Sequence, residues 1–594
     1  MNWTANKGQV IFTFLINFLI MAAAIAQEEQ DWVKKSNEYS KILLEVLAQN
    51  FPESAGRWGV EGMDEDIADL TAGYLERRKA AYEGALSELK AHLENEQQRE
   101  VRQDLQIMID ATEQSLESQL LNQQYQIPYF NVAQTVFNGL RGLLDDQVAA
   151  ERRPAALTRL QKYTGIAEGY TPLAELAEMH TRAAFENSDL KGPFKGQIER
   201  NLGNSERFVG GIEQLFQKYE VGGYEAAFEK LKAQVAAYDD FVRAELLPRA
   251  NEDFRLPPEL YAFQLKQYGV DMPLEELVRR SRVAYKEIQL QMQGLTPAIA
   301  KEKGFAVTDY RELLQALKKE QIVGEEILPF YQDRMKTLEE IIEREKIVTL
   351  PQRDMIIRLA SEAESAASPV PHMQPPRLIG NTGEQGSFVL PLKFPGAEEG
   401  KDSKIDDFTH EAISWALAVH EGRPGHEMQF ASVVEKGVSQ ARVLFGFNSV
   451  NVEGWGLYVE AEMRPYFPLT GQFGGLQSIL LRAIRAFLDP GLQSGEISRD
   501  EALRILQEDG GLSSAMALSE VERYTFRAPG QATSYFCGYL RLMEIRGEAE
   551  LLLGKKFDRQ RFHDFILAQG LLTPTLLRNA VLEIFVRQEM AVVN

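Results

Sequence analysis

Two residue types with distinctive chemistry are scarce in this chain of 594 residues, which contains one cysteine and seven histidines. With only Cys537 available, the chain forms no internal disulfide, so its stability depends on core packing. Positive charge is also in deficit, and the formal net charge is −22 at pH 7. This excess of negative charge argues against nucleic acids or anionic membrane surfaces as partners. No glycine-rich loop connects a strand to a helix, so Rossmann and P-loop folds have no support.

The N-terminal segment has the features of a secretory signal peptide. Lys7 precedes an apolar run, Val10–Ala26, which ends in an A-x-A cleavage pattern. The run is short for a transmembrane helix, which needs about 20 apolar residues. We therefore expect residues 1–26 to be cleaved, with retention as a membrane anchor as the alternative. Cleavage predicts an exported protein, periplasmic or extracellular, without stable membrane insertion.

Apolar periodicity predicts a mainly α fold. Between residues 27 and 345, apolar residues recur at three- and four-residue spacing, which is typical of successive amphipathic helices. The pattern changes after Lys346, where Ile347–Leu350, Met355–Leu359 and Ser387–Phe394 have the composition of strands. We predict a small antiparallel sheet inserted at residues 346–395, followed by the helices of a metal-site part that extends to residue 594. The parts 27–345 and 346–594 are expected to form one continuous catalytic body.

The most informative stretch is HEGRPGH at residues 420–426, which follows an apolar segment, Ala412–Val419. Two histidines and a glutamate directly after the first of them are the residue types of a zinc hydrolase. The imidazoles bind the metal, and the carboxylate activates a water molecule. In the common H-E-x-x-H helix the histidines are four residues apart, about 40° around the axis. Here they are six apart, which is about 120° on a regular helix.

Pro424 indicates how this spacing is reconciled with a shared metal. Its ring clashes with the carbonyl group four residues back, at His420, and it has no N–H to donate. Gly425 tolerates the unusual dihedral angles that a break requires. We predict that the helix departs from α geometry between Gly422 and Gly425, which turns His426 back towards His420.

A catalytic zinc site needs a third protein ligand, and EGWGLYVE at residues 453–460 offers two carboxylates. Glu453 and Glu460 are seven residues apart and share one helix face. The apolar residues between them predict a buried helix, in which carboxylates need partners. One glutamate can bind the metal while the other orients a histidine ligand from the second shell. The alternative is a pair of surface glutamates.

A later segment supplies candidates for contact with substrate. Tyr535 is suited to donate a hydrogen bond to a developing oxyanion, although it can also be a packed aromatic residue. Arg523 and Arg423 are candidates for binding a substrate carboxylate. Ser534 has no evident histidine–aspartate pair, which argues against serine catalysis.

Three segments, HEGRPGHEMQ (420–429), EGWGLYVE (453–460) and PGQATSY (529–535), resemble in this order the bacterial "domain of unknown function 885" family. The resemblance extends from about Phe51 to the C-terminus, and the His-Glu-x-x-Pro-Gly-His pattern is its most specific part. It implies a large helical, zincin-like metallopeptidase. By fold-level analogy with helical peptidases such as carboxypeptidase Taq and angiotensin-converting enzyme, the site is expected in a deep central cleft.

Carried over position by position, the resemblance implies site residues. His420, His426 and Glu453 correspond to the ligands of one zinc ion, and Glu421 corresponds to the general base. Gln531 and Tyr535 are marked as residues near the site, and Gln531 is a candidate for substrate binding. Gly456 departs from the family pattern, where we expect alanine.

Together these features predict a zinc-dependent peptidase that hydrolyses short peptides, as an oligopeptidase or carboxypeptidase. A strand that precedes the metal motif can bind an extended substrate by edge-strand addition, or it can be purely structural. Two other functions stay open. One is a zinc hydrolase of non-peptide amides or esters, and the other is a non-catalytic peptide-binding protein of the cell envelope.

Overall fold

The computed structural model describes residues 31–368, 370–391 and 406–591. The predicted signal peptide, residues 1–26, lies outside these residues, as do the last four residues of the predicted sheet region. The described chain is predominantly helical with one small sheet, as the sequence predicts. No helix in this part of the chain is long and apolar enough to cross a membrane.

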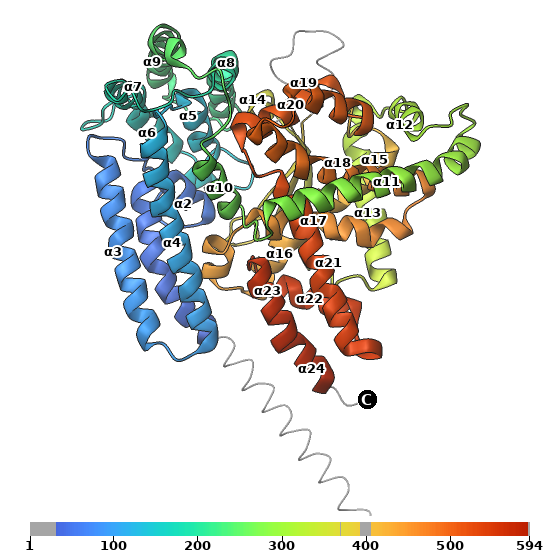
Figure 1. The fold of residues 1–594 in the computed structure, drawn as a ribbon. Coiled ribbons are helices and arrows are strands. Elements are labelled where there is room, and N and C mark those ends of the chain that lie inside the picture. The colour runs from blue at the N-terminus through green and yellow to red at the C-terminus, as the bar shows by residue number, and fades with distance from the viewer. Residues whose placement is uncertain (1–30, 369, 392–405, 592–594) are drawn as a thin grey trace, which may run out of the picture.

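The N-terminal half is a series of helices on one side of the molecule (Figure 1). It begins with a helix over residues 31–50. The elements that follow are α2 (Pro52–Trp58), α3 (Tyr74–Asn95), α4 (Arg99–Tyr125), α5 (Val132–Arg141), η1 (Ala150–Arg152), α6 (Ala155–Tyr163), α7 (Leu173–Ala184), α8 (Lys195–Lys218), α9 (Glu225–Phe241), η2 (Val242–Leu246), η3 (Leu247–Arg249) and α10 (Pro258–Gln267). The labels η denote short 3-10 or π turns.

The remaining elements occupy the other side of the molecule (Figure 1). They are α11 (Leu274–Lys303), α12 (Tyr310–Lys318), η4 (Gly324–Glu326), α13 (Ile327–Glu345), β1 (Ile356–Leu359), α14 (Glu362–Ala367), β2 (His372–Gln374), β3 (Ser387–Leu390), α15 (Glu411–Glu421), α16 (His426–Lys436), η6 (Ala441–Phe445), α17 (Ser449–Met463), η7 (Arg464–Tyr466), α18 (Leu469–Ser494), α19 (Arg499–Arg504), η8 (Ile505–Asp509), α20 (Ser514–Glu522), η9 (Arg523–Arg527), α21 (Thr533–Leu553), η10 (Gly554–Lys556), α22 (Arg559–Ala568), α23 (Pro574–Ala580), η11 (Val581–Phe585) and α24 (Val586–Ala591).

Three hydrophobic clusters account for most of the packing. The largest joins α11–α13 to the helices from α15 onward, and it surrounds the metal motif. Two smaller clusters lie within the N-terminal helices, one around α5–α9 and one between α3, α4 and the first helix. The main core therefore contains residues from both sides of the predicted boundary at 345/346, since α11–α13 pack with the helices of the metal motif.

Local capping and close packing fix the helix that carries Glu453. The side chain of Asn448 accepts a hydrogen bond from the backbone N–H of Asn451 at the start of α17, an interaction worth about 1 kcal/mol. Further along, a Cβ atom on Gly454 would lie 2.5 Å from the Cα atom of Gly538. The backbones of α17 and α21 approach so closely here that only glycine fits. This contact holds Glu453 in register with the segment that carries Tyr535.

The small sheet differs in topology from the prediction. Its order is β1-β3-β2, and β1 pairs with β3 in parallel while β2 pairs with β3 in antiparallel orientation. The predicted antiparallel sheet is therefore a mixed sheet, and Ile347–Leu350 forms no strand. β3 is the central, buried strand, so it is not available for edge-strand addition as expected. The crossover through α14 and β2, which alternation patterns do not encode, decides this arrangement.

Two large cavities lie between the N-terminal helices and the main body. The larger, of about 2130 Å³, borders α4, η6 and α23 and reaches Ser449 on α17. The smaller, of about 920 Å³, lies between α4, α10 and the segment Thr525–Pro529. Both are lined in part by Gln267 and Tyr268. Only the larger comes near the metal motif, at Ser449, which lies one helical turn before Glu453.

Candidate metal centre

The metal motif is broken where the sequence predicts. α15 ends at Glu421, α16 begins at His426, and the four residues between them are not helical. The Arg423–Pro424 peptide bond is cis. A Cβ atom on Gly425 would lie 2.1 Å from the carbonyl oxygens of both Val419 and His420, so the close approach requires glycine. The predicted departure from α geometry is confirmed.

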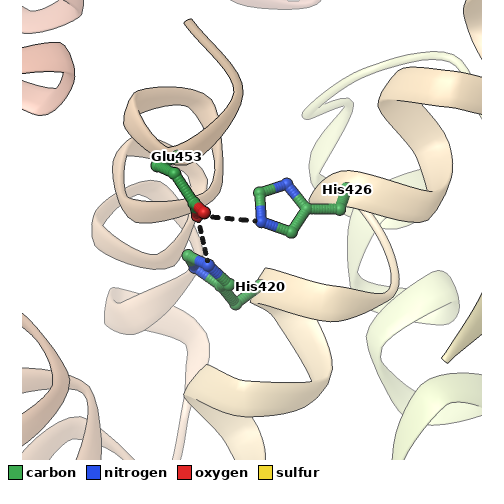
Figure 2. Close-up of side chains that lie close together, drawn as sticks. All are labelled: His420, His426 and Glu453. Atoms are coloured by element: carbon green, nitrogen blue, oxygen red, sulfur yellow. Dashed lines mark hydrogen bonds and ion pairs between the residues drawn. The ribbon is translucent and has the colours of Figure 1, made fainter. Parts of the chain in front are cut away.

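The break brings His420 and His426 to one point opposite Glu453 (Figure 2). Their potential ligand atoms all lie within 4.8 Å of one another. Oε2 of Glu453 is 3.4 Å from Nε2 of His420 and 3.2 Å from Nε2 of His426. Ligands bound tetrahedrally at zinc distances of 2.0–2.1 Å lie about 3.4 Å apart. The three donors therefore fit a zinc ion in both chemistry and spacing.

His420 is held by a carboxylate on its other ring nitrogen. Its Nδ1 lies 2.7 Å from Oε1 of Glu460, so Glu460 is placed in the orienting position that seven-residue spacing allowed. Burial lowers the pKa of His420, but its hydrogen bonds to Glu453 and Glu460 outweigh burial and raise the pKa to about 9. The ring of Tyr535 stacks against His420, with centroids 6.0 Å apart.

Glu453 is oriented by the later segment. Nε2 of Gln531 donates to Oε1 of Glu453 over 3.3 Å and also to Oγ of Ser449 over 2.9 Å. Nε of Arg523 in turn donates to Oε1 of Gln531 over 2.9 Å. Burial raises the pKa of Glu453, but the two histidines outweigh burial and hold it well below its usual range. Gln531, expected near substrate, thus positions a candidate metal ligand.

His426 is supported less directly than His420. Its Nδ1 is buried and has no hydrogen-bond partner among the described residues. The loop before it is fixed by Trp455, whose Nε1 donates to the carbonyl oxygen of Pro424 over 2.9 Å. The position of this imidazole is therefore set by its backbone and by the contact of Nε2 with Glu453, without a second side chain on Nδ1.

Arg423 is directed into a structural network. Its guanidinium donates to Glu427 over 2.7 Å, to Glu339 over 2.8 Å and to the carbonyl oxygen of Arg353 over 2.6 Å. These contacts tie the broken turn to α13 and to the segment before β1. Its donors are thus engaged in supporting the turn, and a substrate contact by Arg423 stays a prediction.

Arg523 and Tyr535 lie together in a buried polar cluster. Besides Gln531, Arg523 donates to the hydroxyl oxygen of Tyr535 over 2.7 Å and lies 3.5 Å from Glu520. Tyr535 thereby keeps its own O–H proton for another acceptor. Its pKa is raised by burial, against the charge of Arg523, so it stays protonated at neutral pH. A substrate contact by Arg523 stays a prediction.

Glu421 is the last residue of α15, and its carboxylate is not engaged by another side chain that the structure describes. The side chain is buried, and it makes no hydrogen bond or ion pair with any described residue. It directly follows His420 in the chain, at the last residue of α15 before the break. An unengaged carboxylate at this point is free to accept a proton from a water molecule, although this role stays a prediction.

Ser449, near the site, is not among the predicted site residues, and Gly456 is marked in the sequence only by its departure from the family pattern. Ser449 bonds to Gln531 and lies four residues before Glu453, a helical spacing that was available as a signal. Gly456 lies beneath both imidazoles, because a Cβ atom there would be 2.6 Å from Cε1 of His420 and 3.1 Å from Cε1 of His426. The alanine that the family resemblance leads us to expect at position 456 would therefore contact both histidine rings.

The chain belongs to the family described as "bacterial protein of unknown function (DUF885)", whose model matches residues 52–581. This confirms the resemblance seen in the sequence. A comparison with curated proteins finds no match.

Two solved structures have the same fold. One, from Shewanella oneidensis, is titled "a putative lipoprotein of unknown function", with 18% identity and a TM-score of 0.69. The other, from Colwellia psychrerythraea, is titled a "putative lipoprotein", with 18% identity and a TM-score of 0.73. Each match covers 93% of this chain and 99% of the other.

Proposed function

We propose that the protein is a zinc-dependent hydrolase of peptide bonds in short peptides. The observation that carries this proposal is the convergence of His420, His426 and Glu453, with separations of 3.2 and 3.4 Å between the two Nε2 atoms and Oε2. Two imidazoles and one carboxylate are a ligand set of catalytic zinc sites, which keep a fourth position for water or substrate. We also propose export, on the basis of the N-terminal sequence.

His420, His426 and Glu453 would hold the zinc ion, which when bound would polarise a carbonyl group as a Lewis acid and lower the pKa of water towards about 7. Glu421 accepts the proton of the attacking water and passes it to the leaving amine, because its carboxylate is adjacent to His420 and has no other partner among the described residues. Glu460 keeps His420 in the tautomer that presents Nε2.

Tyr535 serves as the donor to the developing oxyanion. Its hydroxyl accepts a hydrogen bond from Arg523, which orients the O–H and leaves its proton available. The ring stacked on His420 keeps this hydroxyl near the candidate ligands. The cavity that reaches Ser449, of about 2130 Å³, has room for short peptides, which favours an oligopeptidase or carboxypeptidase over an enzyme of folded proteins.

Replacing Glu421 by glutamine tests this proposal. We expect Glu421→Gln to bind zinc in a 1:1 ratio, as measured by plasma emission spectroscopy, and to lose hydrolysis of a peptide library by about 10²-fold or more. Glu411→Gln, at the opposite end of α15, is the matched control and should retain activity. A wild-type protein without stoichiometric zinc, or a Glu421→Gln variant with full activity, would refute the proposal.

A further inference from the structure

The smaller of the two large cavities, of about 920 Å³, is separate from the candidate metal centre. It lies between α3, α4, α10 and the segment Thr525–Pro529, and none of the described residues that line it is Glu421 or a candidate metal ligand. Pockets for small molecules have volumes of about 300–1,000 Å³ and combine apolar and aromatic walls with a few polar groups. The volume of this cavity lies within that range, so its lining decides what kind of molecule fits.

The lining of this cavity is rich in aromatic side chains. Ten of the 39 residues that line it are phenylalanine or tyrosine, whereas aromatic residues make up 9% of the whole chain. The ring of Phe194 packs against those of Phe254 and Phe526, with centroids 5.9 and 5.7 Å apart. Aromatic walls bind flat apolar rings through stacked and edge-to-face contacts. The enrichment therefore favours a ligand with an aromatic body.

Arg78 on α3 places an unbonded cation in the same lining. Its guanidinium carbon lies 4.5 Å from the ring centroid of Phe51 and 5.2 Å from that of Tyr74. Its buried Nε has no hydrogen-bond partner, and the side chain makes no hydrogen bond or ion pair with any described residue. The carboxylate whose charge acts on it, Asp69, already binds Arg77 over 2.5 Å. Two rings thus hold the guanidinium group while its donors stay available.

Positive side chains outnumber negative ones in this lining. Arg78, Lys191, Arg255 and Arg527 carry positive charge, and Asp253 is the only carboxylate among the described residues that line the cavity. Asp253 is bound by Arg255, with Oδ2 and Nη2 2.6 Å apart. Three cations remain without a carboxylate in the lining, in a chain whose net charge is −22. This local excess of positive charge favours an anionic ligand.

The larger cavity has a different lining. Four acidic and five basic side chains line it, and three of the basic ones, Arg99, Lys266 and Arg442, are in ion pairs with carboxylates. Seven of its 46 lining residues are aromatic. The combination of many rings with excess positive charge is therefore specific to the smaller of these two cavities.

We propose that the smaller cavity binds a small aromatic carboxylate, with its carboxylate on Arg78 and its rings among the aromatic side chains of the lining. A guanidinium group binds a carboxylate through two parallel, charge-assisted hydrogen bonds, and Arg78 has the donors for them. These bonds form inside a cavity, where bulk water screens them less than on an open surface. The inference goes beyond the proposed hydrolase and does not depend on it.

Calorimetry with three small molecules tests the proposal on the full chain, treated with a chelator so that no metal ion competes for the carboxylate. The probes are 2-naphthylacetate, 2-naphthylacetamide, which has the same rings without the charge, and acetate, which has the charge without the rings. We expect the naphthyl acid to bind about 10- to 100-fold more tightly than its amide, and acetate to bind at least as weakly as the amide.

Arg78→Gln should remove the difference between the acid and the amide. Lys79→Gln is the matched control, because Lys79 is the next residue of α3, is exposed, lies 3.7 Å from Glu83 and does not line the cavity. This control should preserve the difference. Thermal unfolding of both variants checks that each is folded.

A second pair of variants tests the cavity itself and does not involve Arg78. Ser118 on α4 lines the cavity, so Ser118→Trp should fill part of it and weaken binding of both naphthyl compounds by about tenfold or more. Leu120→Trp is the matched control, since Leu120 lies two residues further along α4, is 63% exposed and does not line the cavity. It should leave binding unchanged.

Several results would overturn the proposal. Absence of binding by the naphthyl acid, or equal binding of the acid and the amide, would exclude a carboxylate site. A difference that persists in Arg78→Gln would exclude Arg78 as its receptor, and unchanged binding in Ser118→Trp would place the probe outside this cavity. Acetate that binds as tightly as the naphthyl acid would exclude a role for the aromatic walls.

Discussion

The metal side of the molecule and the side of α2 and the small sheet differ in how their polar groups are satisfied. On the metal side, His420 is bound by Glu460, and Glu453 is bound by Gln531. On the side of α2 and the small sheet, Arg57 has no hydrogen bond or ion pair within the described chain. Bonded side chains hold ligands at fixed positions for a metal, whereas unbonded ones are available to a molecule that arrives and leaves. The comparison shows that internal hydrogen bonds hold the metal side in place, whereas none holds Arg57.

Burial explains why the two sides are built differently. Glu460 is fully buried, and a buried carboxylate without partners is strongly unfavourable. Arg57 is exposed, so water can hydrate it. The metal side therefore depends on its internal hydrogen bonds for its stability, while the sheet side does not.

The largest expected effect is on the pH dependence of the unfolding free energy, measured on protein from which a chelator has removed any metal. It arises because the pKa values of His420 and His372 are shifted in opposite directions. The pKa of His420 is about 9 in the fold against 6.5 when unfolded, so its stabilisation is full below pH 6.5 and is lost as pH rises through 9. Between these values we expect wild-type protein to lose about 3 kcal/mol of unfolding free energy relative to His420→Asn. Urea denaturation at pH 6.5 and 9 measures this difference.

His372→Asn provides the contrast on the sheet side. Burial lowers the pKa of His372, so its stabilising contribution is present above pH 6.5 and is lost as pH falls. As the pH rises, the His372→Asn variant should lose as much unfolding free energy as the wild type. As the pH falls, it should lose less than the wild type. An alkaline loss of equal size in His420→Asn and wild type would contradict the comparison.

The next largest effect is expected from Glu460→Gln, which keeps the shape of the side chain but removes the charge that orients His420. We expect zinc affinity to fall about 10- to 100-fold, as measured by competition with a chromogenic chelator. Glu462→Gln is a suitable control, because Glu462 lies on the same helix and pairs with Arg546 instead. Equal zinc affinity in the Glu460→Gln and Glu462→Gln variants would show that Glu460 does not support the metal side.

The smallest expected effect comes from alanine substitutions at two glycines of α17, Gly454 and Gly456, which should change different properties. In Gly456→Ala the new methyl group meets the movable ring of His420 at 2.6 Å, so we expect weaker zinc binding by about tenfold or less. In Gly454→Ala it meets the backbone of Gly538 at 2.5 Å, so we expect a loss of about 1–3 kcal/mol in stability instead. Thermal unfolding and metal titration of both variants test this division. The same response in both would remove the distinction.

Much of the metal side could be predicted because its signals are local. Pro424 and Gly425 enforce the broken turn through clashes within one helical turn, and the structure places the break where expected. Seven-residue spacing put Glu453 and Glu460 on one face, but it left open which of them faces the histidine ligands. The tertiary contacts decide this, since Glu453 lies at Nε2 of both histidines and Glu460 lies at Nδ1 of His420.

The sheet side could not be predicted because it is assembled from distant segments. A pattern of alternating apolar residues does not indicate which strand is central. The crossover through α14 places β3 between β1 and β2. Arg423 looked suited to substrate, but its position in the fold surrounds it with Glu427 and Glu339. Arg57 belongs to no sequence motif, and its surroundings depend on the packing of α2 against α5 and the segment after β2.

The sequence by itself therefore determined the helical class, the family, the break between Glu421 and His426, and the residues able to bind a metal. These follow from backbone sterics and helical periodicity, which act over a few residues. Only the tertiary structure decided the strand order, the hydrogen bond by which Glu460 orients His420, and the support of Glu453 by Gln531. These depend on which distant side chains are buried together, because desolvation and hydrogen bonding are settled when the chain packs.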